Sequence, residues 1–103
     1  MVLVRSLIEN RMVILMDEPF SALDTITRLK LQDLAASLLI NRTVLLVTHD
    51  PLEALRLGHQ IYIINGEPAK VSIGIQPGGT VPRDIDDDDL LKSQAKLMKM
   101  LTL

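Results

Sequence analysis

The stretch Met12-Val13-Ile14-Leu15-Met16-Asp17-Glu18-Pro19-Phe20-Ser21-Ala22-Leu23-Asp24 decides the fold of this chain. Its five consecutive apolar residues, followed by two adjacent carboxylates, predict a strand buried on both faces that delivers acids at its carboxyl end. Ligands of open parallel sheets bind outside the carboxyl ends of the strands, so phosphate and metal chemistry is expected here. One acid can hold Mg²⁺ directly or through water, and its neighbour can accept a proton from an attacking water.

A helix and a second strand are expected after this stretch. Residues 25–40 carry leucines and alanines at helical spacing, which predicts an amphipathic crossover helix with Asp24 as its N-cap. Residues 43–47 are apolar and β-branched and predict a strand. Strand, helix and strand in this order predict a right-handed parallel unit. Both strands then end at the same edge of the sheet, so we expect His49 to lie within reach of Glu18.

Asp50-Pro51-Leu52-Glu53 has the signature of a helix start. It offers an acid at the cap, Pro at the first helical position and Glu three residues after the cap, as in a capping box. The helix is expected to end at Gly58. Residues 60–64 predict a third strand, and Asn65-Gly66 predicts a hairpin turn into residues 69–75.

Helices are expected at both ends of the chain. Residues 1–9 predict the end of a helix with its leucines and isoleucine on one side. Residues 76–83 contain two Pro and two Gly and predict a loop or linker. Residues 90–101 predict a terminal helix, whose two methionines are interpreted as packing residues. The acids at 86–89 suggest either a cation site or a solvated helix start, and the helix start is favoured.

Composition excludes several classes of function. The chain has 103 residues, which bounds it to a single compact unit. It is 48% hydrophobic with one Phe, one Tyr and no Trp, so its core must be aliphatic, as suits a helix-covered parallel sheet. A net charge of −2 without a basic cluster argues against nucleic-acid binding. The absence of Cys excludes disulfides. No apolar run approaches the roughly 20 residues of a membrane span, so a membrane role must run through a partner.

Three motifs resemble those of one family. Residues 13–19 resemble the Walker B motif of an ABC-transporter ATPase, and Ser21-Ala22-Leu23-Asp24 resembles its D-loop. Residues 44–50, with Glu53-Ala54 close behind, resemble its switch-histidine strand and loop. The resemblance covers roughly residues 1–65. It implies an α/β fold, a three-layer P-loop NTPase-like fragment built on a parallel sheet, with a C-terminal hairpin and helix.

The resemblance also implies roles for individual residues in the complete protein. Asp17 is expected to help hold Mg²⁺, Glu18 to orient or deprotonate the attacking water, and His49 to contact the γ-phosphate of ATP. The D-loop residues Ser21, Ala22, Leu23 and Asp24 are expected to cross the interface between two ATPase subunits. The same four residues also fit a capping box, and the sequence does not separate a cap from a dimer contact.

The implied partners are those of an importer. A second ATPase subunit, a membrane permease and, indirectly, a solute-binding protein are expected, with ATP and Mg²⁺ as cofactors and a cytoplasmic location at the inner face of the membrane. Residues 51–58 and the Gly66-Glu67-Pro68 turn resemble the branch that imports nitrate, sulfonates, taurine and thiamine precursors. No nucleic-acid partner is expected.

Two motifs of the family are not found in this sequence. Gly78-Gly79 is not followed by Lys, so no phosphate-binding G-x-x-x-x-G-K-[ST] loop is present. The signature motif is expected upstream of Met1. Residues 1–103 therefore predict the carboxyl-terminal part of a nucleotide-binding domain, with sheet and crossover helices over 1–75 and linker and terminal helix over 76–103. A non-catalytic truncated or decayed module and a different P-loop ATPase, such as a DNA-repair ATPase, remain as alternatives.

Overall fold

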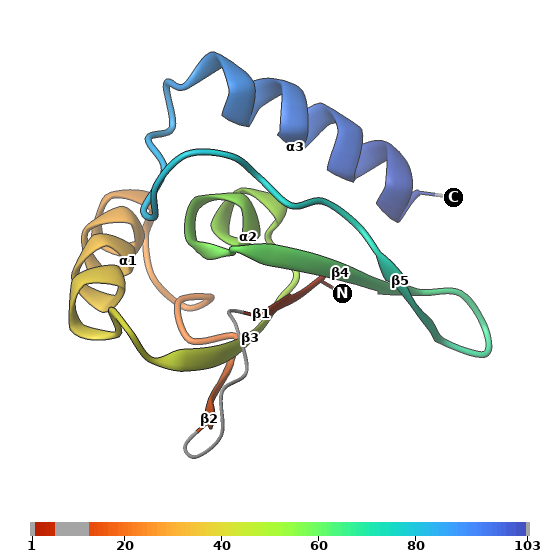
Figure 1. The fold of residues 1–103 in the computed structure, drawn as a ribbon, viewed down its shortest axis with the longest axis horizontal. Coiled ribbons are helices and arrows are strands. Elements are labelled where there is room, and N and C mark those ends of the chain that lie inside the picture. The colour runs from red at the N-terminus through yellow and green to blue at the C-terminus, as the bar shows by residue number, and fades with distance from the viewer. Residues whose placement is uncertain (1, 6–12, 103) are drawn as a thin grey trace.

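The computed structural model describes residues 2–5 and 13–102, which form a five-stranded mixed sheet and three helices. In chain order the elements are β1 (Val2–Arg5), β2 (Val13–Asp17), α1 (Thr25–Leu38), β3 (Thr43–Thr48), α2 (Pro51–Leu57), β4 (Gln60–Asn65), β5 (Lys70–Ile73) and α3 (Asp88–Leu101). Figure 1 shows their arrangement. None of the helices in these ranges is long and apolar enough to cross a bilayer.

The predicted parallel strand pair is present. The strand order is β2-β3-β1-β4-β5, and β2 pairs with β3 in parallel, with Val13 opposite Thr43 and Asp17 opposite Val47. Helix α1 connects the two strands, as the crossover pattern predicts. The other pairings are antiparallel, including the predicted hairpin of β4 and β5. Gly66 has φ +89° in the turn of this hairpin, a conformation that favours glycine.

The prediction of a helix over residues 1–9 is wrong where the structure describes that segment. Val2–Arg5 forms β1, which lies in the middle of the sheet and pairs antiparallel with both β3 and β4. A short apolar run does not distinguish a strand from a helix by periodicity. The strands β3 and β4 both offer backbone groups that need partners, and a strand between them satisfies both sides. Residues 6–9 of the predicted helix lie outside the described residues.

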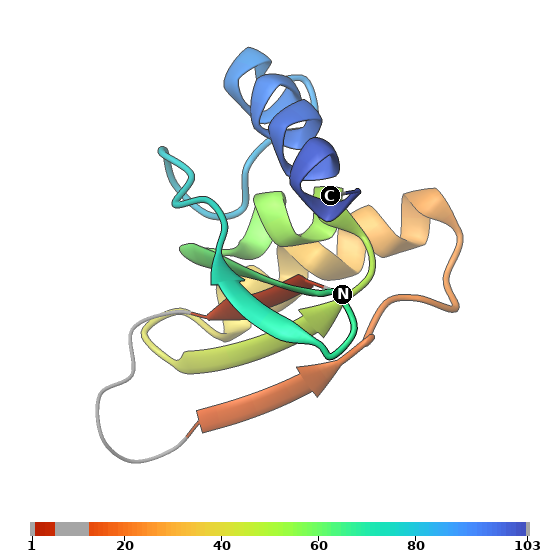
Figure 2. The ribbon, with the colours of Figure 1, turned by 90° about the vertical axis from the view of Figure 1, so that its right-hand side faces the viewer.

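The helices lie on one side of the sheet (Figure 1, Figure 2). Helix α2 packs on β1 and β3, and α3 packs on α2 and β4. The core between these elements is aliphatic, as predicted, and comprises Leu46, Ala54, Leu55, Ile61, Ile63, Leu90 and Leu97. The opposite face of the sheet carries exposed apolar side chains, namely Val13, Leu15, Val71 and Ile73. The described residues thus show a sheet and one helical layer of the three layers expected.

Helix α1 is capped as predicted but does not bury its apolar side. Asp24 accepts a hydrogen bond from the backbone N–H of Thr27 at 3.1 Å. The leucines at 31, 34 and 38 are exposed, whereas Gln32 is the buried residue of this helix. A cavity of about 850 Å³ lies between the last turns of α1 and β3. The predicted packing of the apolar side of α1 on the sheet is therefore not seen. The helix contacts α2 instead.

Helix α3 begins two residues earlier than predicted. Asp87 is its N-cap and accepts from the N–H of Asp89 at 2.8 Å, which agrees with the interpretation of the acids as a helix start. Leu97 is fully buried and Met100 packs against the core. Met98 is 49% exposed, so its interpretation as a packing residue is wrong. It follows Leu97 directly and is therefore turned about 100° away from the buried side of the helix.

Residues 76–83 form a loop, as predicted, and the loop is tied to α2. The buried guanidinium of Arg83 donates to the carbonyl oxygens of Leu55 at 2.9 Å and Gly58 at 2.7 Å, at the end of α2. It also donates to the oxygens of Pro77 and Gly78, so one side chain fastens this segment to α2. Burial lowers the pKa of Arg83 from its ordinary value, and the charge of Asp87 opposes that shift.

We expect Leu97→Ala to lower the free energy of unfolding by about 2–5 kcal/mol, because it leaves a cavity in the core under α3. Met98→Ala, one residue further along the same helix, should change it by no more than about 0.5 kcal/mol. Urea denaturation followed by circular dichroism measures both. Equal effects of the two substitutions would show that α3 does not pack on the core in solution.

Candidate functional site

Glu18 follows β2 directly and has a left-handed backbone conformation. Its φ is +50°, a region that residues with side chains rarely adopt. The N–H of Glu18 donates to the carbonyl oxygen of Val47 at 2.8 Å, which extends the ladder one residue beyond β2. The Ser21 hydroxyl donates to the carbonyl oxygen of Glu18 at 3.2 Å. The strained residue is thus fixed by hydrogen bonds on both sides.

Glu18 and His49 meet at the carboxyl edge of the sheet. His49 follows β3, which is parallel and adjacent to β2. Its Nδ1 contacts Oε1 of Glu18. The side chain of His49 is 68% exposed and that of Glu18 is 29% exposed. The predicted geometry of this pair is confirmed, while the roles of the two residues remain predictions.

The other predicted site residues lie around this pair. Asp17 is the exposed last residue of β2. Ser21 and Ala22 are exposed, and Leu23 is half-buried. Asp24 caps α1, and the hydrogen bonds from Thr27 hold its pKa below the ordinary value. Ser21 does not act as a cap, since its hydroxyl bonds to Glu18, so the four-residue capping box is wrong and Asp24 alone is the cap.

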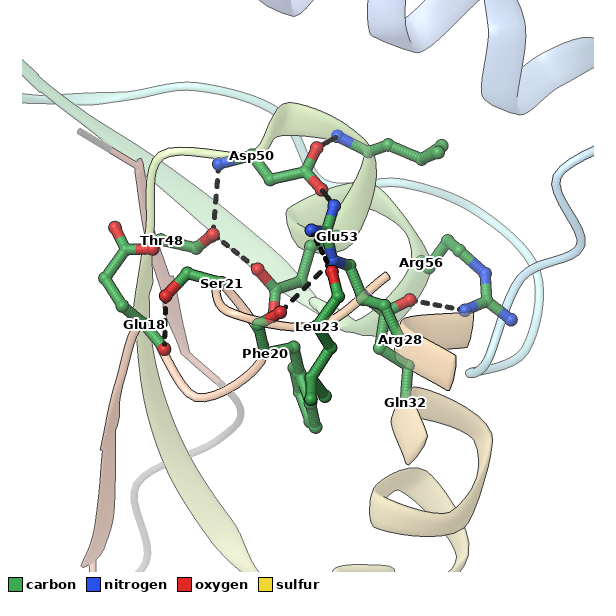
Figure 3. A network of polar contacts seen from close by, with 11 residues as sticks. Glu18, Phe20, Ser21, Leu23, Arg28, Gln32, Thr48, Asp50, Glu53 and Arg56 are labelled. Carbon is green, nitrogen blue, oxygen red and sulfur yellow. Dashed lines mark hydrogen bonds and ion pairs between the residues drawn. The ribbon is translucent and has the colours of Figure 1, made fainter. Parts of the chain in front are cut away.

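Arg28 connects the two loops that carry the site, and sequence reasoning missed it. Its Nε donates to the carbonyl oxygen of Phe20 at 3.2 Å and its Nη2 to that of Leu23 at 2.8 Å. Its Nη1 lies 3.7 Å from Oδ2 of Asp50, the residue after His49 (Figure 3). A cation in the first turns of a helix interacts unfavourably with the helix dipole. This unfavourable placement was the one signal in the sequence that Arg28 has another role.

Thr48 and Glu53 form the second missed feature. The predicted cap of α2 is present, since Oδ1 of Asp50 accepts from the N–H of Leu52 at 3.0 Å. The expected capping box is wrong, because Glu53 does not accept from the N–H of Asp50. That N–H donates to Oγ1 of Thr48 at 3.0 Å, and the Thr48 hydroxyl donates to Oε2 of Glu53 at 2.5 Å (Figure 3).

These side chains surround a pocket of about 240 Å³, lined by Glu18, Ser21, Arg28, Thr48, His49, Asp50 and Glu53. Burial raises the pKa of Glu53, the hydrogen bond from Thr48 opposes the shift, and the charges of Asp50 and Glu18 add to it. Folding therefore favours the protonated carboxyl. The contribution of Glu53 to stability is present below its ordinary pKa and is lost as the pH rises through the raised value.

The pocket alone does not provide a metal cage. Within residues 2–5 and 13–102, no group of three or more His, Cys, Asp or Glu side chains is arranged to hold a metal ion. Mg²⁺ commonly binds through one or two carboxylates together with phosphates and water. The single exposed carboxylate of Asp17 fits that mode of binding. Three acids against one arginine in the pocket do not favour a polyphosphate by themselves.

Comparison with known proteins finds relatives of one class. The homologues of this chain, at 37–45% identity over about 96% of its length, are ABC-transporter ATP-binding proteins. The resemblance seen in the sequence is therefore confirmed. An uncharacterized ABC transporter ATP-binding protein of Haemophilus influenzae is 45% identical over 102 residues, which cover 96% of this chain and 42% of that protein.

Several of these relatives carry a more particular name. The aliphatic sulfonates import ATP-binding protein SsuB 1 of Pseudomonas syringae is 39% identical over 94% of this chain and 42% of its own length. The protein of the same name from Nocardia farcinica is 37% identical over 96% of this chain and 40% of its own length. The chain thus spans about two fifths of these relatives. No family model and no solved structure matches it.

The backbone strain at Glu18 predicts that glycine is more stable than alanine at this position, the reverse of the usual order. Because glycine adopts positive φ without steric cost, Glu18→Gly should be more stable than Glu18→Ala by about 1 kcal/mol. At Asp17, the last residue of β2, which is still paired with β3, the glycine variant should be the less stable one by about 0.5–1 kcal/mol. Chemical denaturation of the four variants measures both differences. The same sign at both positions would contradict a left-handed Glu18.

Proposed function

We propose that this chain supplies the Walker B, D-loop and switch-histidine part of the ATP-hydrolysing subunit of an ABC importer. The observation that carries the proposal is the contact of Glu18 with His49 at the carboxyl edge of two parallel strands. Ligands of parallel sheets bind at this edge. Homology to ABC-transporter ATP-binding proteins supports the same activity.

In the proposed mechanism, each polar residue of the edge has one task. Glu18 orients the attacking water or accepts its proton, and its fixed backbone keeps the carboxylate at the end of β2. When both ring nitrogens carry a proton, Nδ1 donates to Glu18 and Nε2, on the far side of the exposed ring, can donate to the γ-phosphate. Asp17 would hold Mg²⁺, which neutralises charge on the phosphates when bound.

We further propose that the site is completed by residues of a longer protein. Phosphate binding in P-loop ATPases depends on backbone N–H groups and a Lys of a glycine-rich loop, and this sequence contains no such loop. The chain spans about 42% of the Haemophilus and Pseudomonas relatives. In this proposal residues 1–75 form the second half of a three-layer nucleotide-binding domain, and residues 76–103 form its linker and terminal helix. The exposed apolar face of the sheet would receive the third layer.

The proposed partners follow from importer function. Ser21 and Ala22 are exposed beside Glu18, as a segment that crosses to a second ATPase subunit must be. A permease in the membrane would receive the energy of hydrolysis, and a solute-binding protein would act through that permease. The chain would then work at the cytoplasmic face of the membrane. We propose aliphatic sulfonates as the class of solute, since the named relatives import them.

The role of Glu18 can be tested in the complete ATPase. Glu18→Gln retains size and hydrogen bonding but removes proton acceptance, so Mg-ATP should still bind while turnover falls by about 10²-fold or more. Glu67→Gln, in the exposed hairpin turn, is the matched control and should hydrolyse ATP at the unsubstituted rate. Phosphate release and nucleotide binding are measured side by side. Hydrolysis by the Glu18 variant at the control rate would exclude the role.

The 103-residue chain by itself should neither bind Mg-ATP appreciably nor hydrolyse it. Its pocket presents Glu18, Asp50 and Glu53 against Arg28, so an added polyanion meets mostly negative charge. Calorimetric titration with Mg-ATP is the measurement. A Kd below about 100 μM, or roughly −5.5 kcal/mol, would show a site that needs nothing outside this chain. Absence of binding together with an inactive parent protein would favour a non-catalytic module.

A further inference from the structure

A buried relay of hydrogen bonds reaches the turn that carries His49. It starts at Glu53 in the first turn of α2, passes through the hydroxyl of Thr48 and ends at the backbone N–H of Asp50. Thr48 is fully buried and Glu53 is 3% exposed. His49 lies between the two residues that the relay fixes, while its own side chain is largely exposed. The direction of the imidazole therefore depends on how its two neighbours are held.

Glu53 is not needed to cap helix α2, so its buried carboxyl group calls for another explanation. Asp50 already caps α2, so the helix start does not depend on Glu53. Among the described residues, Oε1 of Glu53 is the buried side-chain atom that has no hydrogen-bond partner, and such an atom costs stability. A hydrogen bond to an ionised carboxylate is shorter and stronger than one between neutral groups. The strength of the hydrogen bond between Thr48 and Glu53 therefore depends on whether the Glu53 carboxyl group is ionised.

We propose that Glu53 is a positioning residue, which holds His49 opposite Glu18 through Thr48 and the backbone of Asp50. The relevance of this role to catalysis rests on the proposed function, whereas the positioning of His49 itself does not. Glu53 touches neither His49 nor Glu18 in a hydrogen bond and acts through Thr48 alone. Glu53, His49 and Glu18 line the same pocket, so the residue at the start of the relay lies close to the pair that it is proposed to position.

The charge of Glu53 is set by groups from three parts of the fold. Asp50 in the α2 cap and Glu18 after β2 favour the neutral carboxyl, whereas Arg28 of α1 favours the charged one. Burial raises the pKa of Glu53, so the carboxyl titrates above the ordinary range of glutamate. Ionisation of Glu53 strengthens its bond to Thr48 and so tightens the turn at His49. The position of His49 is therefore expected to respond to the protonation of Glu53.

The sequence provides an internal control for this response, because His49 and His59 are its only histidines. His59 lies exposed on the loop between α2 and β4. In a pH titration of the labelled 103-residue chain by NMR, the ring resonances of His49 should show a second step that coincides with the titration of the Glu53 carboxyl. Those of His59 should show none. The step should vanish in Glu53→Gln and persist in the control Glu67→Gln.

Substitutions of Thr48 test the path of the effect. Thr48→Val keeps the shape but removes the hydroxyl, so the second step of His49 should be lost and the Asp50 amide should exchange with solvent about five- to tenfold faster. Thr48→Ser keeps the hydroxyl and should preserve both properties. These readouts need no nucleotide, so an inactive parent protein would leave them unchanged. Wild-type titration of His49 in both Glu53→Gln and Thr48→Val, with unchanged Asp50 exchange, would overturn the proposal. If either variant fails to fold, the other decides alone.

Discussion

The parallel register of β2 and β3 is the constraint on which the candidate site depends. Side chains alternate between the faces of a strand, so a slip by one residue would turn every side chain of β2 to the opposite face. The pairing of Asp17 with Val47, extended by the bond from the Glu18 N–H to Val47, fixes where β2 ends. Glu18 and His49 face each other because their strands run in the same direction and end within one residue of each other.

Two buried arginines join the helical side of the molecule where apolar packing is sparse. Helix α1 leaves its leucines exposed and makes its contact with α2 through polar groups. The guanidinium of Arg56 donates to Gln32 and Asp33 of α1, each at 2.5 Å, and to the carbonyl oxygen of Arg83 at 2.8 Å. A buried charge is tolerated when its hydrogen bonds are satisfied, and here they connect three segments distant in sequence. Arg28 repeats this arrangement closer to the site.

Local patterns in the sequence were sufficient for the elements that depend on neighbouring residues. The cap at Asp24, helix α2 between Asp50 and Gly58 and the hairpin at Asn65-Gly66 were all predicted, since each depends on a few adjacent residues. Strand β1 was not, because its state is decided by β3 and β4 rather than by its own four residues. The Thr48–Glu53 bond was also missed, since the capping-box pattern offers Glu53 a nearer partner. The contact of His49 with Glu18 was foreseeable only from the topology.

Among the described residues, β2 has a neighbouring strand on one side only, and it carries exposed Val13 and Leu15. An open strand edge with apolar side chains is a template on which another chain can add a strand. This edge bears no proline within Val13–Asp17 and only one charge, so it lacks the usual protection against such addition. At high concentration, the purified chain is therefore expected to associate through the open edge of β2. Such association would indicate that no other segment covers this edge.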